Sequence, residues 1–469
     1  MKKLFYNGTI LTMEKAGCEA VLIEDGRIAA LGAPDELKAS AGEDCEWVDL
    51  QGRCLMPAFI DGHSHLMQFA NSLKLVPLSG CKSIAEVQEN FRAYMAEKKV
   101  GPDDWVLGFG YDQNQLAEKR HLVREDLEAI STTNPIIVCH ASYHMGTMNG
   151  KAMEYYGVHE GIEDPVGGAY GRDEQGRLTG YAEEAAYMSG PYNKIMSLDN
   201  ADDYLEAAQD VYIRNGITTV QEGIITEPGI QMFQQAGQKG QLKVDVVAYV
   251  DLAKSADSIP KHPELKQYDH RLRLGGYKLF LDGSPQGKTA WMSKPYEDSG
   301  DYCGYPTLSD DKLDAYVQKA LDDGQQLLAH CNGDAAAQQF INGYLHSRQK
   351  RTDTRPVMLH CQTLRDDQMP AMVDIGMLAS FFVAHVYYWG DIHLKNFGPE
   401  RGNNISPTGS ALKAGLQFTL HQDTPVIPPN MLETVWAAVN RVSKAGVHIG
   451  PHQAISVYEA LEDVTIHAA

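Results

Sequence analysis

The stretch LMPAFIDGHSH, residues 55–65, is an apolar, strand-like run that ends in the pair His63 and His65. Side chains two positions apart on a strand point to the same face, so both imidazoles can reach one cation. Imidazole is a common ligand of zinc and similar ions. The pair alone is weak evidence, because many histidines have structural roles or lie exposed at the surface.

Later strand-like runs carry further polar side chains at or near their ends. Each run is short and hydrophobic, which predicts a buried parallel strand. In a barrel of alternating strands and helices, the carboxyl ends of all strands meet at one mouth, where catalytic residues gather. The series therefore predicts one metal centre assembled by a barrel. Its later members are Lys278 in GGYKLFLDG (275–283), His330 in QQLLAHCNGD (325–334), His360 in PVMLHCQT (356–363) and Asp423 in LQFTLHQDTP (416–425).

The chain divides into a small N-terminal β unit, residues 1–57, and a barrel, residues 58–469. In the first unit, Asp25-Gly26 between two alternating apolar runs predicts a hairpin. Residues from about 70 to 200 are far too long for a simple crossover, so we expect an inserted subdomain after the first barrel strand. Eight candidate strand ends are the number that a closed (β/α)8 barrel needs. They lie near His65, Gly223, Val250, Gly283, Gly333, Thr363, His385 and Asp423.

Composition narrows the classes of partner. The formal net charge is -21, which disfavours nucleic acid and anionic membranes, because both are polyanions. The apolar run near the N-terminus is interrupted at Asn7 and Gly8, too early for the apolar core of a secretion signal. We see no apolar stretch of membrane-spanning length. The eight cysteines show no CxxC pair, so a disulfide framework or zinc ribbon is not indicated. We expect a cytoplasmic protein with a small-molecule substrate, and a homo-oligomer stays open.

Several polar and aromatic residues are candidates for substrate contacts at the mouth. An aromatic cluster in FFVAHVYYWGD (381–391) suits an apolar substrate group, and packing of the loop against the barrel explains it equally well. For the polar residues of the insertion, a structural or surface role is about as well supported. The candidates are Tyr111, Asp112, His144, Asn149 and Glu184 in the insertion, and His385, Tyr387, Tyr388 and Trp389 after the seventh strand.

An ordered set of motifs resembles the amidohydrolase superfamily, and specifically its YtcJ-like branch, the amidohydrolase 3 family. The resemblance covers nearly the whole chain. The stretches are MPAFIDGHSH (56–65), GITTVQEG (216–223), GGYKLFLDGSPQGKTA (275–290), LLAHCNGDAA (327–336), LHCQT (359–363) and FTLHQDTPV (418–426).

The resemblance implies a distorted TIM-type barrel with a small β-sandwich, and a metal-dependent hydrolase that attacks carbon–nitrogen bonds other than peptide bonds. It implies one or two ions of zinc or another divalent metal. Lys278 occupies a position where related enzymes can carry a carboxylated lysine that bridges two metals. The alternative is a lysine paired to Asp282 or another acid. The implied ligands are His63, His65, Lys278, His330, His360 and Asp423.

The chemistry implied is hydrolysis of an N-acyl or N-formyl amine, or of a cyclic amide. Zinc lowers the pKa of a bound water to about 7, which makes hydroxide available at neutral pH. Asp423 is the expected proton acceptor, and His330 or His360 the expected group that polarises the carbonyl. The alternative is a degenerate homologue that binds a ligand or partner without turnover.

Two features depart from the family pattern. The chain ends at YEALEDVTIHAA (458–469), where relatives continue into strands that complete the sandwich, so the C-terminal half of that unit is expected to be missing. An N-terminal unit without those strands exposes sheet edges. Lys288 stands where relatives commonly have arginine, and lysine cannot form the same bidentate contact with a carboxylate.

Overall fold

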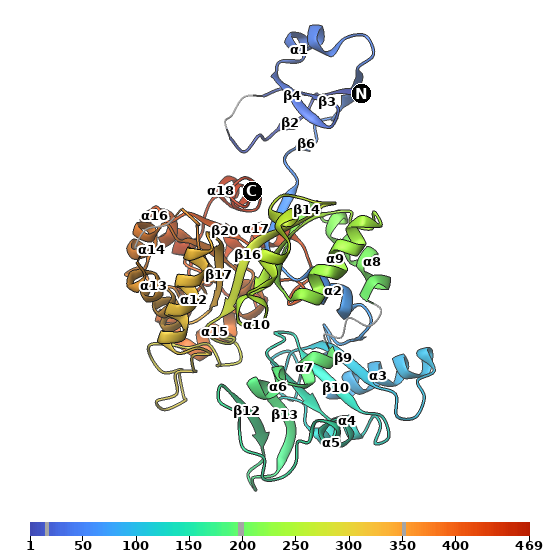
Figure 1. The fold of residues 1–469 in the computed structure, drawn as a ribbon, viewed down its shortest axis with the longest axis vertical. Helices are drawn as coiled ribbons and strands as arrows, with labels where there is room; N and C mark the ends of the chain where they lie inside the picture. The colour runs from blue at the N-terminus through green and yellow to red at the C-terminus, as the bar shows by residue number, and fades with distance from the viewer. Residues whose placement is uncertain (15–17, 196–200, 349–352) are drawn as a thin grey trace.

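The centre of the computed structural model is a sheet of eight parallel strands that follow one another in chain order (Figure 1). The structure describes residues 1–14, 18–195, 201–348 and 353–469. The sheet and its helices form the expected distorted TIM-type barrel. The strands are β7 (Phe59–Ser64), β14 (Ile217–Ile225), β15 (Asp245–Asp251), β16 (Leu272–Phe280), β17 (Gln326–Cys331), β18 (Val357–His360), β19 (Leu378–Phe381) and β20 (Phe418–Leu420).

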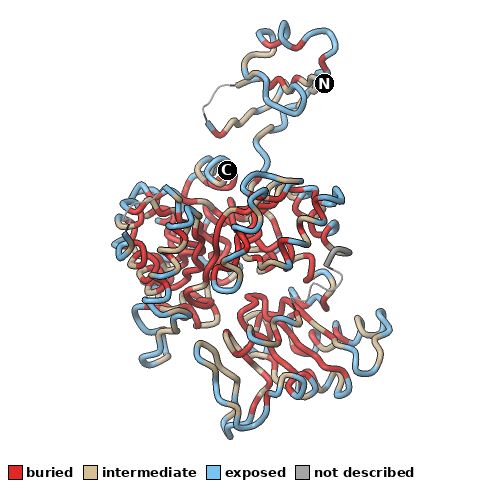
Figure 2. Tube along the Cα trace, in the orientation of Figure 1, coloured by how far each residue is buried: buried red, intermediate tan, exposed pale blue. Residues whose placement is uncertain are grey.

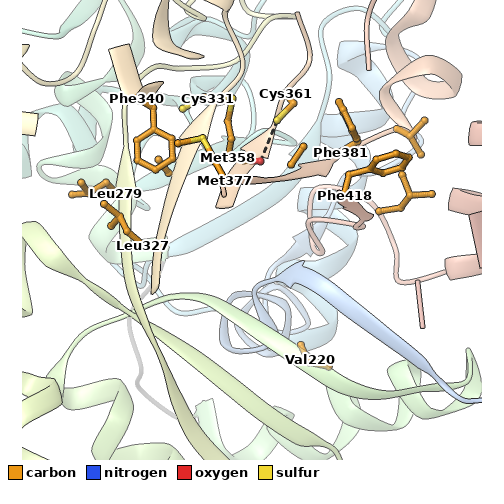
Figure 3. Packing of buried hydrophobic residues seen from close by; sticks show 14 of the residues in the cluster. Val220, Leu279, Leu327, Cys331, Phe340, Met358, Cys361, Met377, Phe381 and Phe418 are labelled. Atoms are coloured by element: carbon orange, nitrogen blue, oxygen red, sulfur yellow. Dashed lines mark hydrogen bonds between the residues drawn. The ribbon is translucent and has the colours of Figure 1, made fainter. Parts of the chain in front are cut away.

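Helices connect these strands and cover the outside of the sheet, as a right-handed succession of strand–helix units requires. Apolar side chains of strands and helices form one continuous cluster, in which Leu279 and Leu327 of the sheet join Phe340 of α13 (Figure 3). The covering helices include α8 (Ala201–Arg214), α9 (Glu227–Gln238), α12 (Asp310–Asp322), α13 (Asp334–His346), α14 (Met369–Ile375), α15 (His385–Gly402), α16 (Thr408–Ala414), α17 (Met431–Asn440) and α18 (Val457–Asp463).

The N-terminal residues form a separate small β unit, joined to the barrel by the segment before β7 (Figure 1). The predicted Asp25-Gly26 hairpin is confirmed, because β3 and β4 pair antiparallel across it. The unit also contains a helix, α1 (Pro34–Ala41), that the strand pattern did not indicate. Its main sheet has the order β4 (Arg27–Gly32), β3 (Ala20–Glu24), β1 (Lys2–Tyr6) and β5 (Glu46–Asp49), and β2 (Thr9–Ile10) pairs with β6 (Cys54–Leu55).

The long excursion between the first two barrel strands builds a six-stranded sheet with its own buried core (Figure 2). Its helix α3 (Ile84–Lys98) begins where Ser83 accepts a hydrogen bond from the Glu86 N–H, a standard N-cap. The sheet order is β12 (Gly168–Arg172), β13 (Leu178–Glu184), β11 (Met145–Met148), β10 (Ile136–His140), β9 (Val106–Tyr111) and β8 (Val76–Pro77), with α4 (Arg124–Glu128), α5 (Gly150–Tyr156), α6 (Ala185–Met188) and α7 (Pro191–Ile195) around it.

The inserted sheet lies on the side of the barrel where helices α10 (Leu252–Ser255) and α15 begin, which is the carboxyl end of the strands (Figure 1). The mouth of the barrel therefore faces the insertion. Among the helices of the described segments, none has both the length and the apolar character needed to cross a membrane.

Arg441, at the carboxyl end of α17, is buried and donates hydrogen bonds to three backbone carbonyls. Its guanidinium donates to the carbonyl oxygens of Ile449, Ser406 and Ile405 at 2.8, 3.1 and 2.6 Å. Replacing Arg441 with Met leaves these acceptors unsatisfied, so we expect a loss of about 3 kcal/mol in the free energy of unfolding, measured by chemical denaturation. Arg177→Met removes a side chain that is 70% exposed and should change stability little. Equal stability of the two variants would contradict the expectation.

Candidate metal centre

Three side chains with metal-ligand chemistry meet at the carboxyl end of the barrel, where the two edge strands of the sheet come together. His63 lies in β7, His65 follows that strand directly, and Asp423 follows β20. Asp423 Oδ1 lies 3.6 Å from His63 Nε2 and 3.3 Å from His65 Nε2. One ligand atom from each residue lies within 4.8 Å of the others. We call these residues the His-His-Asp group.

Backbone hydrogen bonds between the two edge strands place this group. The Asp423 N–H donates to the His63 carbonyl at 2.9 Å, and the His65 N–H donates to the Thr424 carbonyl at 2.8 Å. The Gln422 N–H donates to the buried Asp61 carboxylate at 3.2 Å. These bonds join the segment after β20 to β7 and close the barrel. The separation of the three ligands is therefore set by the main chain.

The electrostatics of the group suit a cation. Burial lowers the pKa of His63 well below its usual value, and the nearby Lys278 acts in the same direction. Burial alone would raise the pKa of Asp423, but the hydrogen bond with His65 and the positive groups around it lower that pKa to about 2. Burial would likewise lower the pKa of His65, yet the nearby carboxylates of Asp423 and Glu222 raise it. The group thus offers an ionised carboxylate and imidazole nitrogens, the donor set of divalent metals.

The nitrogens that face Asp423 Oδ1 are the Nε2 atoms of both histidines, and the Nδ1 atoms lie away from it. His63 Nδ1 and His65 Nδ1 are buried and have no hydrogen-bond partner in the structure. Buried polar atoms usually have a partner, and an unpaired one marks a place where an ion or water belongs. Two imidazole nitrogens and a carboxylate oxygen converge on the Nε2 side, and this donor set fits a divalent cation.

The other candidate ligands lie around the group at different distances. Lys278 Nζ lies 3.3 Å from His63 Nε2, and no acid of the described residues lies within 4 Å of it, so the alternative pairing with Asp282 does not occur. His360 Nδ1 lies 3.9 Å from Asp423 Oδ2. The His330 ring meets that of His360 edge to face, with centroids 4.4 Å apart, while its Nε2 lies 3.2 Å from the Gly283 carbonyl.

A cavity of about 490 Å³ adjoins the His-His-Asp group, between barrel and insertion. Glu222 connects the two, because it lines the cavity and its Oε1 lies 3.8 Å from His65 Nδ1. A second hollow, of about 20 Å³, is lined by His330, His360, His385 and Asp423. His144 lines both spaces. The large cavity is lined mainly by apolar side chains, among them Met67, Met188, Ile224, Ile225, Leu279, Phe280 and Leu308.

Comparison with known proteins assigns the family. The family model described as "Amidohydrolase family" matches residues 46–469 of the sequence. The chain belongs to this amidohydrolase family. N-substituted formamide deformylase of Arthrobacter pascens is 27% identical over 99% of this chain and 88% of that protein. The YtcJ protein of Bacillus subtilis (strain 168) is 24% identical over 98% of this chain and 88% of that protein, and the expected YtcJ-like assignment is confirmed.

A solved structure agrees with the family assignment over the entire chain. A metal-dependent hydrolase from Pyrococcus horikoshii OT3, described as uncharacterized, superposes with a TM-score of 0.77 at 25% identity. The match covers 100% of this chain and 92% of that one. The amidohydrolase fold thus extends over the whole of this chain.

Within this amidohydrolase, two of the residues expected to contact substrate are hydrogen-bonded to each other. Trp389 Nε1 donates to Asp112 Oδ2 at 2.9 Å, which ties α15 of the barrel to the insertion. Trp389 packs with Phe382 and Ile427, so packing of the loop, the alternative from the sequence, accounts for this ring. His385 lines the small hollow and lies 3.0 Å from His393, Nδ1 to Nε2.

Two other candidates from the insertion have interior structural positions. The Tyr111 ring belongs to the apolar core of the inserted sheet, and its hydroxyl lies 3.1 Å from His121 Nδ1. The Asn149 side chain caps α5 by accepting from the Ala152 N–H, and it donates to the carbonyl of Asn134. Neither residue lines the two spaces described above, so neither enters the proposed site.

Two buried residues of the amidohydrolase site did not emerge from the sequence as ligands or contacts. His421 Nε2 lies 3.1 Å from His360 Nδ1, and its ring centroid lies 5.3 Å from that of His63. The signal was present, because His421 and Asp423 are two positions apart, the same spacing as His63 and His65. Glu222 accepts a hydrogen bond from the Met67 N–H at 2.9 Å. The only indication of Glu222 in the sequence was a single acid within a strand-like run.

Proposed function

We propose that this chain is a metal-dependent hydrolase that cleaves a carbon–nitrogen bond other than a peptide bond, in an N-acyl or N-formyl amine or in a cyclic amide. The observation that carries the proposal is the His-His-Asp group at the barrel mouth, beside a largely apolar cavity of about 490 Å³. Such a combination is typical of an active site. The formamide deformylase relative supports amide hydrolysis as the reaction class.

The metal ligands in this proposal are the three residues of the His-His-Asp group, with Lys278 and His360 adjoining them and His330 beside His360. Zinc is the first candidate, and a second ion requires that Lys278 be carboxylated, since a lysine ammonium has no lone pair. When bound, such an ion supplies a nucleophilic water at neutral pH and polarises a carbonyl.

The chain supplies the proton transfer and the orientation. Asp423 Oδ1 faces both imidazoles, so Oδ2 is the atom available to take a proton from the attacking water and return it to the leaving nitrogen. His360 and His330 lie on the Oδ2 side, where an imidazole N–H can donate to the carbonyl oxygen. The apolar lining of the cavity disfavours bulk water beside the reacting bond.

Removing divalent ions tests this function. Protein purified without chelator should contain about one or two equivalents of zinc or a similar ion, measured by elemental analysis. Dialysis against a chelator should remove at least nine-tenths of the turnover of an N-substituted formamide, and added zinc should restore it, because the group has no other source of activated water. Full activity of metal-free protein would contradict the proposal. Bound metal without turnover of any amide would favour the degenerate, ligand-binding alternative.

A further inference from the structure

Glu184, the last residue of β13, places a carboxylate in the wall of the large cavity. The residue is only 3% exposed. Its Oε2 lies 2.9 Å from His144 Nδ1, while Oε1 is buried and has no hydrogen-bond partner. Leaving a charged oxygen unpaired in the interior is costly, so this atom points to a ligand that donates a hydrogen bond.

Both backbone and packing hold Glu184 in this position. Its φ of 46° and ψ of -123° lie in a region that residues other than glycine rarely adopt. A Cβ on Gly283 would lie 2.2 Å from Glu184 Oε1, so the carboxylate occupies space that only glycine leaves free. The Gly283 carbonyl is in turn 3.2 Å from His330 Nε2. Glu184 Oε1 and His330 Nε2 therefore both approach Gly283.

The position of His144 relates this carboxylate to the reacting bond. His144 lines both the large cavity and the small hollow that contains Asp423, and its ring centroid lies 5.2 Å from that of His330. Glu184 and His144 thus stand at the boundary between the apolar cavity and the His-His-Asp group. A substrate that spans this boundary places its amide next to Glu184 and its apolar substituent in the cavity.

The charges of the cavity restrict that substituent further. Besides Glu184, its lining includes Glu222, Asp251 and Asp282. The lining has two basic side chains: His144, whose Nδ1 lies 2.9 Å from Glu184 Oε2, and Lys254, which is 74% exposed and lies 3.8 Å from Asp251. A carboxylate on the amine part of a substrate would meet these acids, while the one buried basic side chain among the described lining residues, His144, is already paired with Glu184. Such a placement is unfavourable in a site of low dielectric.

We propose that Glu184 Oε1 accepts the N–H of the scissile amide, so that the site selects secondary amides of uncharged, apolar amines. This inference rests on the proposed function, because only hydrolysis makes this amide the bond that is cleaved. The selection itself is a property of binding. It excludes tertiary amides, which have no N–H, and N-acyl amino acids, which carry a carboxylate on the amine part.

Binding to chelator-treated full-length protein, followed by calorimetry, tests the selection without turnover. The matched ligands are N-phenethylformamide, N-methyl-N-phenethylformamide and N-formylphenylalanine. We expect the secondary amide to bind at least tenfold more tightly than each of the other two. Equal affinities of the secondary and tertiary amides for the wild-type protein, or tighter binding of N-formylphenylalanine, would overturn the inference, and neither result needs a variant to fold.

Glu184→Gln shows whether the carboxylate is responsible. Its amide keeps an oxygen toward His144 and turns an NH2 donor to the cavity, so the preference for the secondary over the tertiary amide should fall to less than threefold. Glu183→Gln is the matched control, because Glu183 accepts from the Tyr181 hydroxyl instead and should keep the preference. An unchanged preference in Glu184→Gln would overturn the assignment. Selective binding without hydrolysis by metal-loaded protein would overturn only the proposed function.

Discussion

Replacing Gly223 by alanine is expected to weaken the binding of a divalent cation at the His-His-Asp group at least a hundredfold. Gly223 lies in β14, and a Cβ at this position would lie 2.3 Å from His63 Cε1 and 2.8 Å from His65 Cε1. Contacts under about 3 Å are not tolerated in a packed interior, so both rings must move. Because both ligands move while the backbone bonds hold Asp423 in place, the geometry of the donor set is lost. The measurement is metal affinity by competition with a chromophoric chelator.

Gly32→Ala is the control for this substitution. Gly32 ends β4 in the N-terminal unit, and its added Cβ would approach the flexible end of the Glu36 side chain at 3.2 Å. This variant should bind metal as the wild type does. A circular dichroism spectrum shared by both variants would show that the barrel is retained. Normal metal affinity in Gly223→Ala would mean that His63 and His65 do not form the site.

Asp423→Asn is expected to lower kcat about a thousandfold, or ~4 kcal/mol in the activation free energy. An amide cannot accept the proton of the attacking water, and it also removes the negative charge that faces His63 and His65. The two imidazoles remain, so we expect the metal and the fold to be largely retained. Steady-state kinetics on an N-substituted formamide, with metal content measured on the same sample, separates loss of chemistry from loss of metal.

The control is Asp366→Asn, an exposed aspartate after β18, which should leave kcat unchanged. Near-normal turnover by Asp423→Asn would refute the role of Asp423 as the proton acceptor. A variant that has lost both metal and activity would show instead that Asp423 acts mainly as a ligand.

Local regularities made the barrel and most of its ligands predictable. Apolar runs that end in polar residues indicate buried parallel strands, and the carboxyl ends of such strands meet at one mouth. The same alternation that paired His63 with His65 applies to His421 and Asp423, so His421 could have been found by the argument already in hand. Glu222 could not, because a single acid in a buried strand does not reveal what its carboxylate contacts.

Contacts between distant segments decided the remaining features. Tyr111 and Trp389 look alike in sequence as aromatic candidates, yet one packs inside the insertion and the other binds Asp112 across the subdomain boundary. That difference depends on how the inserted sheet is placed against the barrel. No periodicity within either segment encodes such a contact.

The amino-acid sequence by itself determined the approximate strand ends, the family and the residue types at the mouth, because these depend on patterns a few positions long. The predicted seventh end was late, since β19 ends at Phe381 and His385 begins α15. The tertiary structure alone decided which of those residues converge. The backbone bonds of Asp423 to His63 and of His65 to Thr424 bring three ligands within 4.8 Å. Glu184 keeps a buried oxygen without a hydrogen-bond partner in the cavity wall, because Gly283 leaves room for it. Such distances depend on closure of the sheet and on packing of the insertion, which join segments hundreds of positions apart.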